Sequence, residues 1–68
     1  MNLLYNDKTD LLYIRLDSKK QAVINKRIGD EVVLDLGEEG KIVGIEILNA
    51  SHHVNLKELL PIEYAVAV

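Results

Sequence analysis

Cysteine, tryptophan and phenylalanine are absent from this chain of 68 residues, and proline occurs once, at Pro61. The absence of cysteine excludes disulfide bonds and thiolate metal sites. No apolar run approaches the ~20 residues that span a bilayer, and the first ten residues lack the basic stretch and apolar run typical of a signal peptide. These absences predict a cytoplasmic protein.

Leucine, isoleucine and valine supply most of the 49% of residues that are hydrophobic. A chain of this length forms a single domain, residues 1–68, and buries only about 60% of the surface that its unfolded form exposes. Small domains without disulfides often gain stability by association, so we expect a homodimer or a higher oligomer. The net charge of −3 provides no general attraction to nucleic acid or anionic lipid.

Alternation of apolar and polar residues predicts four or five antiparallel strands arranged as hairpins. The predicted strands cover residues 3–5, 11–17, 22–28, 31–36 and 41–48. The lysine in residues 22–28 favours an edge position, because charge there discourages pairing with another sheet. Gly40 ends the turn before the last strand, where we expect a positive φ.

Residues 55–60 predict a short helix with Asn55 as its N-cap, Glu58 as a capping-box partner and Pro61 at its end. Residues 62–68 predict either a strand of the same sheet or a segment that reaches another subunit. The predicted fold class is α+β, mainly β: an antiparallel hairpin meander of four to five strands with one short C-terminal helix. The predicted core comprises Leu12, Ile14, Leu16, Val32, Leu34, Ile45, Ile47, Leu56 and Leu59.

His52 and His53 form the most obvious candidate metal site. Adjacent side chains diverge on a strand or a helix, whereas paired metal ligands on a helix usually lie three or four residues apart. We therefore favour solvated histidines over a metal site.

Asp35 and Glu46 lie on neighbouring predicted strands and are able to approach one another. A carboxyl pair that performs acid–base catalysis needs a cleft that separates the two pKa values, and a small sheet offers little room for one. The favoured interpretation places both residues on a solvated face, or pairs them with Lys41 or Arg15.

The basic residues form a local patch that favours a solvated edge or a docking surface for an acidic partner over a nucleic-acid site. This patch comprises Lys19, Lys20, Lys26 and Arg27, extended by Arg15. Gly37 and Gly40 bracket two glutamates, which would repel phosphate, and neither Ser18 nor Ser51 lies in a nucleophile elbow. The sequence therefore predicts no catalytic residue, no cofactor and no metal site, and we expect a protein that is not an enzyme.

Two stretches of the sequence resemble a small prokaryotic family known as domain of unknown function 2283. The first runs from Tyr5-Asn6-Asp7 to Asp10-Leu11-Leu12-Tyr13-Ile14-Arg15-Leu16, and the second covers residues 33–51. The resemblance spans roughly residues 4–51, and its most specific part is the Gly-Ile-Glu-Ile-Leu-Asn-Ala-Ser stretch of residues 44–51. Gly29-Asp30 stands where many members have Asp-Gly, and Asn49 where Asp is common.

The resemblance implies a compact, mostly β domain and supplies no established activity or functional residue. Members of the family are often encoded beside small toxin-like proteins, which implies an antitoxin-like role. Within the shared stretch, Gly44 suggests a bulge or a close approach by another group, and Asn49 and Ser51 suggest a strand end and a capped turn.

Three functional hypotheses follow from these observations. The leading one is a non-catalytic protein-interaction module, an antitoxin-like partner of a small toxin. The alternatives are a small ligand- or metal-binding protein that uses His52 and His53, and a nucleic-acid-binding regulator that uses the basic patch.

Overall fold

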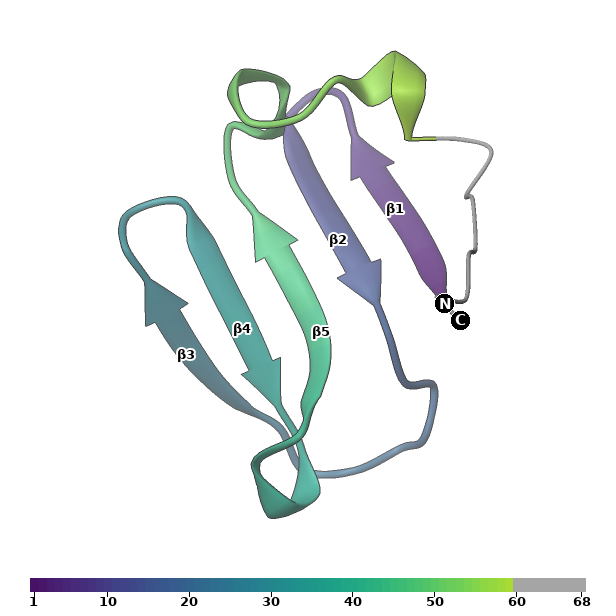
Figure 1. Ribbon diagram of the computed structural model, residues 1–68, viewed down its shortest axis with the longest axis vertical. Helices are drawn as coiled ribbons and strands as arrows, with labels where there is room; N and C mark the ends of the chain where they lie inside the picture. Colours follow the sequence, from purple (N-terminus) through teal and green to yellow (C-terminus); the bar gives the residue numbers. More distant parts are fainter. Residues whose placement is uncertain (60–68) are drawn as a thin grey trace, which may run out of the picture.

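Five strands form one open antiparallel sheet in the computed structural model, which describes residues 1–59 (Figure 1). The strands are β1 (Asn2–Asn6), β2 (Leu11–Arg15), β3 (Ile24–Ile28), β4 (Val32–Leu36) and β5 (Ile42–Ile47). Short 3-10 turns join or follow them: η1 (Glu38–Gly40), η2 (Ala50–His52) and η3 (Leu56–Glu58). The prediction of a mainly β, antiparallel fold is confirmed.

The order of strands across the sheet is β1-β2-β5-β4-β3. Hairpins join β1 to β2, β3 to β4 and β4 to β5, but β2 pairs with β5 rather than with β3. Residues 16–23 carry the chain from β2 to the far edge of the sheet (Figure 1). The predicted meander is therefore wrong, whereas the predicted edge position of the strand with Lys26 is confirmed. The more apolar β5 occupies the centre, and the charged β3 remains at the rim.

Local chemistry explains two of the turns. The Asn6 side chain accepts hydrogen bonds from the backbone N–H groups of Lys8 (2.9 Å) and Thr9 (3.3 Å), so it closes the β1–β2 turn. Gly40 has φ +72°, which confirms the expected left-handed residue before β5.

Strand register gives the sheet one apolar face. We define the apolar face as the side of the sheet that carries two mostly hydrophobic rows, each with one residue from every strand. These rows are Tyr5–Leu12–Ile47–Val32–Ile28 and Leu3–Ile14–Ile45–Leu34–Lys26. The opposite side, which we call the polar face, carries Tyr13, Arg15, Arg27, Asp35 and Glu46.

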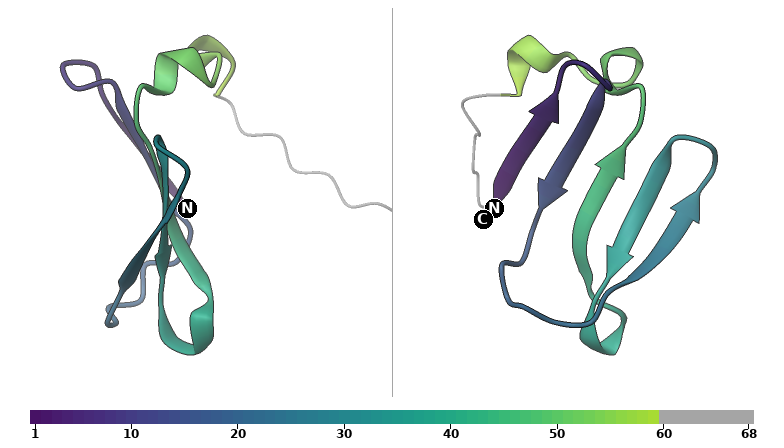
Figure 2. Two further views of the ribbon diagram at one scale, coloured as in Figure 1. Left: turned by 90° about the vertical axis from the view of Figure 1, so that its left-hand side faces the viewer. Right: turned by 180° about the vertical axis from the view of Figure 1, so that it is seen from behind.

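The predicted core is mostly half-buried, because the sheet is a single layer (Figure 2). Leu12 is 1% exposed, but Leu16 is exposed, and the other predicted core side chains have intermediate exposure. The remaining buried hydrophobic residues, which the sequence did not indicate, are Val33, Val43 and Ala50.

A bulge and a close approach were the alternatives suggested by Gly44, and the structure has both at this position. The β4–β5 register shifts between Asp35 and Leu36, which produces a bulge beside Gly44. A Cβ on Gly44 would lie 2.5 Å from the Tyr13 hydroxyl oxygen, so the tyrosine ring covers this position closely. Glycine is required here for space rather than for backbone conformation.

The predicted helix over residues 55–60 is wrong within the described part of the chain, where η3 forms a single 3-10 turn. Asn55 does cap this turn, since its side chain accepts from the Lys57 N–H at 3.2 Å. Three residues cannot propagate the i→i+4 hydrogen bonds of an α-helix. Pro61 and the alternatives for residues 62–68 lie outside the described residues. Among residues 1–59, no helix has the length and apolar character needed to cross a membrane.

Candidate functional site

The polar face brings Asp35, Glu46 and Tyr13 together from three neighbouring strands. Asp35 on β4 is directly opposite Gly44 on β5, and Tyr13 on β2 covers Gly44 from the other side. Asp35 is only 8% exposed, and its Oδ1 has no hydrogen-bond partner among the described residues. The interpretation of Asp35 as a solvated surface residue is therefore wrong, because the bulky Tyr13 lies beside it. The suggested partner Lys41 instead lies 3.9 Å from Glu39.

Burial and the two carboxyl groups shift the pKa values in this cluster. Burial raises the pKa of Glu46, and Asp35 raises it further, whereas Arg27 opposes the shift. Burial also raises the pKa of Tyr13, again with a contribution from Asp35 and an opposing one from Arg15. Both shifts favour the neutral forms of Glu46 and Tyr13 in this cluster.

A shallow hollow of about 360 Å³ lies next to this cluster. It is lined by Leu11, Asn25, Arg27, Val33, Glu46 and Leu48. Glu46 belongs to the lining and Asp35 does not, so a molecule in the hollow meets one carboxyl of the pair. Two-carboxyl acid–base chemistry requires both groups within hydrogen-bond reach of the reacting molecule.

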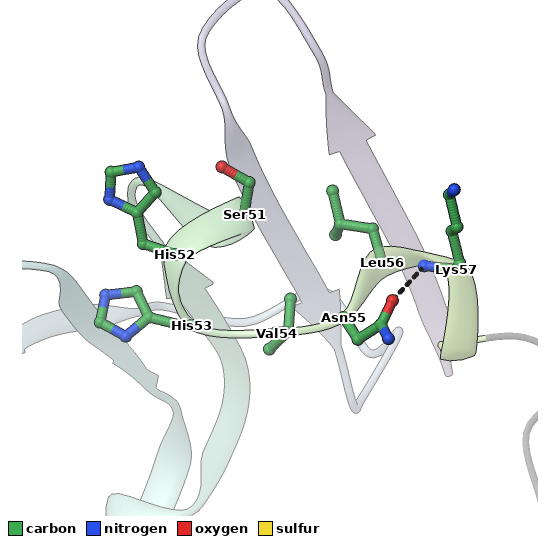
Figure 3. Close-up of a pocket in the computed structure, with 7 residues that line it drawn as sticks. All are labelled: Ser51, His52, His53, Val54, Asn55, Leu56 and Lys57. Atoms are coloured by element: carbon green, nitrogen blue, oxygen red, sulfur yellow. Dashed lines mark hydrogen bonds between the residues drawn. The ribbon is translucent and has the colours of Figure 1, made fainter.

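His52 is the last residue of η2, and His53 follows it as the C-cap (Figure 3). Both imidazole rings extend to the side of the turn away from Leu56 and Lys57, next to an open hollow of about 500 Å³ that residues 51–57 line. His53 Nε2 lies 3.1 Å from Glu31 Oε1. Within residues 1–59, no three His, Cys, Asp or Glu side chains gather as a metal site. The described residues thus bring one carboxylate to the histidines.

A set of hydrogen bonds that the sequence did not indicate ties η2 to the β1–β2 turn. Asp10 accepts from the Tyr5 hydroxyl at 2.7 Å, the Ser51 hydroxyl at 2.6 Å and the Ser51 N–H at 3.0 Å. The backbone N–H of Ala50 also donates to the Asp10 carbonyl at 2.9 Å. We call this group of contacts the Asp10–Ser51 clasp. The hydrogen bonds from Ser51 and then Tyr5 lower the pKa of Asp10.

Asn49 links the same turn to Glu31, the residue before β4. It is left-handed at φ +51° in the turn that follows the end of β5 at Ile47, and its side chain makes no cap for η2. The side-chain amide instead donates to Glu31, just before β4, and this bond together with His53 lowers the pKa of Glu31. Polar residues after β5 therefore join this end of the sheet to the β1–β2 turn and to Glu31.

The basic residues do not share one surface. Lys26 lies on the apolar face and Arg27 on the polar face, because adjacent residues of a strand point to opposite sides. Lys19 pairs with Glu38 at 3.1 Å, and the Arg15 Nε donates to the Asp17 carbonyl at 2.7 Å. This dispersion does not support the nucleic-acid alternative.

The apolar face is the remaining candidate surface. Its β3 edge exposes Ile24 by 73% and Ile28 by 47%. At the opposite end, Leu56 and Leu59 of the η3 region form a small hollow of about 160 Å³ with Leu3, Tyr5 and Leu12.

A family model described as "Protein of unknown function (DUF2283)" matches residues 2–51. The chain belongs to this family. The match confirms the resemblance predicted over residues 4–51. Comparison with curated proteins and with solved structures finds no match.

The DUF2283 segment covers the whole of the described sheet. It begins at the first residue of β1, contains all five strands and ends at Ser51, the residue that closes the Asp10–Ser51 clasp. The η3 turn follows the matched segment. The features identified within the DUF2283 pattern, including Gly44 and Asn49, therefore have structural roles in this chain.

Proposed function

We propose that this protein is a non-catalytic protein-interaction module that docks another polypeptide on the apolar face. One observation carries the proposal: the β4–β3 end of this face exposes large aliphatic side chains, and no element within residues 1–59 crosses it (Figure 2). Each square ångström of apolar surface removed from water is worth about 25 cal/mol. A protein partner of matching apolar character therefore gains free energy by covering it.

The polar face supports the non-catalytic part of the proposal. Asp35 is too buried to touch a substrate, and its partner Glu46 lines a shallow hollow alone. Tyr13 and Gly44 pack around the pair as structural groups. The cluster thus fits a role in fixing the strand order.

The finer part of the proposal is an antitoxin-like role, in which a small toxin pairs with an edge strand of the sheet. The family resemblance supports this role, and so does the sheet itself. Within residues 1–59, β1 and β3 are the two edges of the sheet, and an edge strand can accept a strand from a partner. Cytoplasmic location is part of the same proposal.

The test is a tagged pull-down from the native host, with bound proteins identified by mass spectrometry. Ile28→Lys places a charge on the exposed apolar face, and Leu4→Lys places the same charge on β1, at a position 61% exposed and on the opposite face. We expect one small stoichiometric partner with the wild type and with Leu4→Lys, and its loss with Ile28→Lys. Equal capture by all three proteins, or no stoichiometric partner with the wild type, would contradict the proposal.

A further inference from the structure

The two ends of the apolar face differ, because the η3 region lies at the β1–β2 end and no described element lies over the β4–β3 end. The η3 region lies beside the ends of β1 and β2 (Figure 1), where Leu56 and Leu59 line a small hollow with Leu3, Tyr5 and Leu12 of the apolar face. Across the sheet, β4 and β3 carry Val32 and Ile28 with no described element over them (Figure 2). The surface is therefore stepped from one edge of the sheet to the other.

We infer that a second copy of this chain covers the apolar face, in a face-to-face dimer whose two-fold axis runs parallel to the strands. This inference rests on the proposed function and names the polypeptide on that face. A two-fold axis parallel to the strands places β1 of one copy over β3 of the other. Each η3 region then lies at the β4–β3 end of its partner. It covers the part of the apolar face that the partner's own η3 region leaves open.

A two-fold axis across the strands does not have this property. It places both η3 regions at the same edge, where they hold the two sheets apart and leave the β3 edges unpacked. Stacked sheets in proteins pack at a uniform spacing of about 10 Å with nearly aligned strands. The parallel axis satisfies that spacing at both edges.

The size of the face meets the requirement of a stable dimer. Five strands about 4.8 Å apart and five residues long at about 3.3 Å each cover roughly 400 Å² in projection. Two such faces, with the relief of their side chains included, bury on the order of 1,000 Å² or more. This total reaches the lower limit for a specific protein–protein interface, which is about 1,000 Å².

The distribution of charge on the face favours a like partner. Lys26 is the one charged residue in the two rows that define the apolar face, and it lies on the edge strand β3. At the rim of a stacked pair, the aliphatic part of Lys26 lies along apolar surface while its ammonium group reaches water. The centre of the face has no charge that would select a different protein, and an isologous contact needs only complementarity of the face to itself.

The first experiment measures the mass of the purified full chain by light scattering after gel filtration, at low and high micromolar concentration. We expect a dimer for the wild type and for Leu4→Lys, and a folded monomer for Ile28→Lys and for Ile24→Lys, with unchanged circular dichroism. A wild-type monomer, or a dimer that neither face substitution weakens, overturns the inference.

Binding of an apolar dye separates the two proposals if the wild type is a monomer. A monomer that binds the dye retains an open apolar face, so the proposed function stands and the self-partner is wrong. A monomer that does not bind the dye has no open apolar face, and both proposals fail.

Introduced cysteines test the axis, since the chain has none of its own. In a double variant, Ile28→Cys with Leu59→Cys, oxidation should yield a covalent dimer, because the inferred axis brings β3 of one copy under the η3 region of the other. The matched control, Leu4→Cys with Leu59→Cys, should remain monomeric on a denaturing gel. Equal cross-linking of both variants overturns the arrangement.

Discussion

At the scale of single residues, Glu46 is the side chain whose charge the fold disfavours. Burial and the adjacent Asp35 raise its pKa above the ordinary value for glutamic acid. The contribution of Glu46 to stability is therefore complete below its unfolded-state pKa and is lost as pH rises through the raised folded-state pKa. Above that folded-state pKa, the ionised Glu46 lowers the stability of the folded chain.

Glu46→Gln should consequently raise the free energy of unfolding at pH 7. The gain should shrink towards pH 4, where Glu46 is protonated in the folded wild type. Urea unfolding followed by circular dichroism at both pH values measures the difference. Glu39→Gln, on the exposed η1 turn, is the control and should change stability by no more than about 0.5 kcal/mol. Lower stability of Glu46→Gln at pH 7 would contradict the assignment.

Gly44→Ala should destabilise the protein by about 1–3 kcal/mol, because the new Cβ overlaps the Tyr13 ring. A double-mutant cycle with Tyr13→Leu isolates this contact. The alanine should cost less in the Tyr13→Leu background, where the ring no longer covers residue 44. An equal loss in both backgrounds would assign the penalty to the backbone rather than to the ring.

Residue-level features were predictable where one position determines them. The left-handed Gly40 and the closely covered Gly44 follow from the need for glycine in turns and at close approaches. The burial of Asp35 depends on Tyr13, which reaches it only because β2 lies beside β5. No local pattern contains that neighbour relation, so the sequence alone places Asp35 on a solvated face.

At the scale of elements, the Asp10–Ser51 clasp joins the end of β5 to the first hairpin. Ser51→Ala removes one side-chain hydrogen bond to a carboxylate and should cost about 1–2 kcal/mol at pH 7. Ser18→Ala, in the exposed loop after β2, should have little effect. Equal stability of the two variants would show that the Ser51 hydroxyl contributes nothing to the clasp.

The same clasp gives a pH dependence with a defined sign. Hydrogen bonds lower the pKa of Asp10, and Asn49 and His53 lower that of Glu31. A lowered carboxyl pKa contributes stability that is complete above the unfolded-state pKa and is lost as pH falls through the folded-state value. The urea concentration at the unfolding midpoint of the wild type should therefore decrease as the pH is lowered below about 4. The difference between the midpoints of the wild type and Ser51→Ala should shrink over the same pH range.

Strand positions were predictable from alternation, but strand order was not. Each strand carries a period-2 pattern that identifies it locally, whereas the pairing of β2 with β5 joins segments that are far apart in the sequence. The helix prediction failed for a related reason. Asn55 and the leucines that follow suit the first turn of any helix, and they do not distinguish a 3-10 turn from an α-helix.

At the scale of the whole molecule, one open sheet must provide the stability of the fold. Leu12 is the largest side chain that is fully buried among the described residues, and the rows beside it are half-covered. A domain of this size in which residues 1–59 leave one face uncovered gains little stability from those residues alone. Covering the apolar face with a second copy supplies the missing burial, so folding and association should be linked.

Linked folding and association predict a melting temperature that rises with protein concentration. Each tenfold increase should add about 1.4 kcal/mol of apparent stability per dimer, which corresponds to a rise of a few degrees. Differential scanning calorimetry over a hundredfold range measures this slope. Leu4→Lys should retain it, because Leu4 lies on the opposite face, whereas Ile28→Lys should melt at a lower temperature that does not depend on concentration. A wild-type melting temperature that is constant over this range would mean that the single sheet is stable alone and that its apolar face does not hold a second copy.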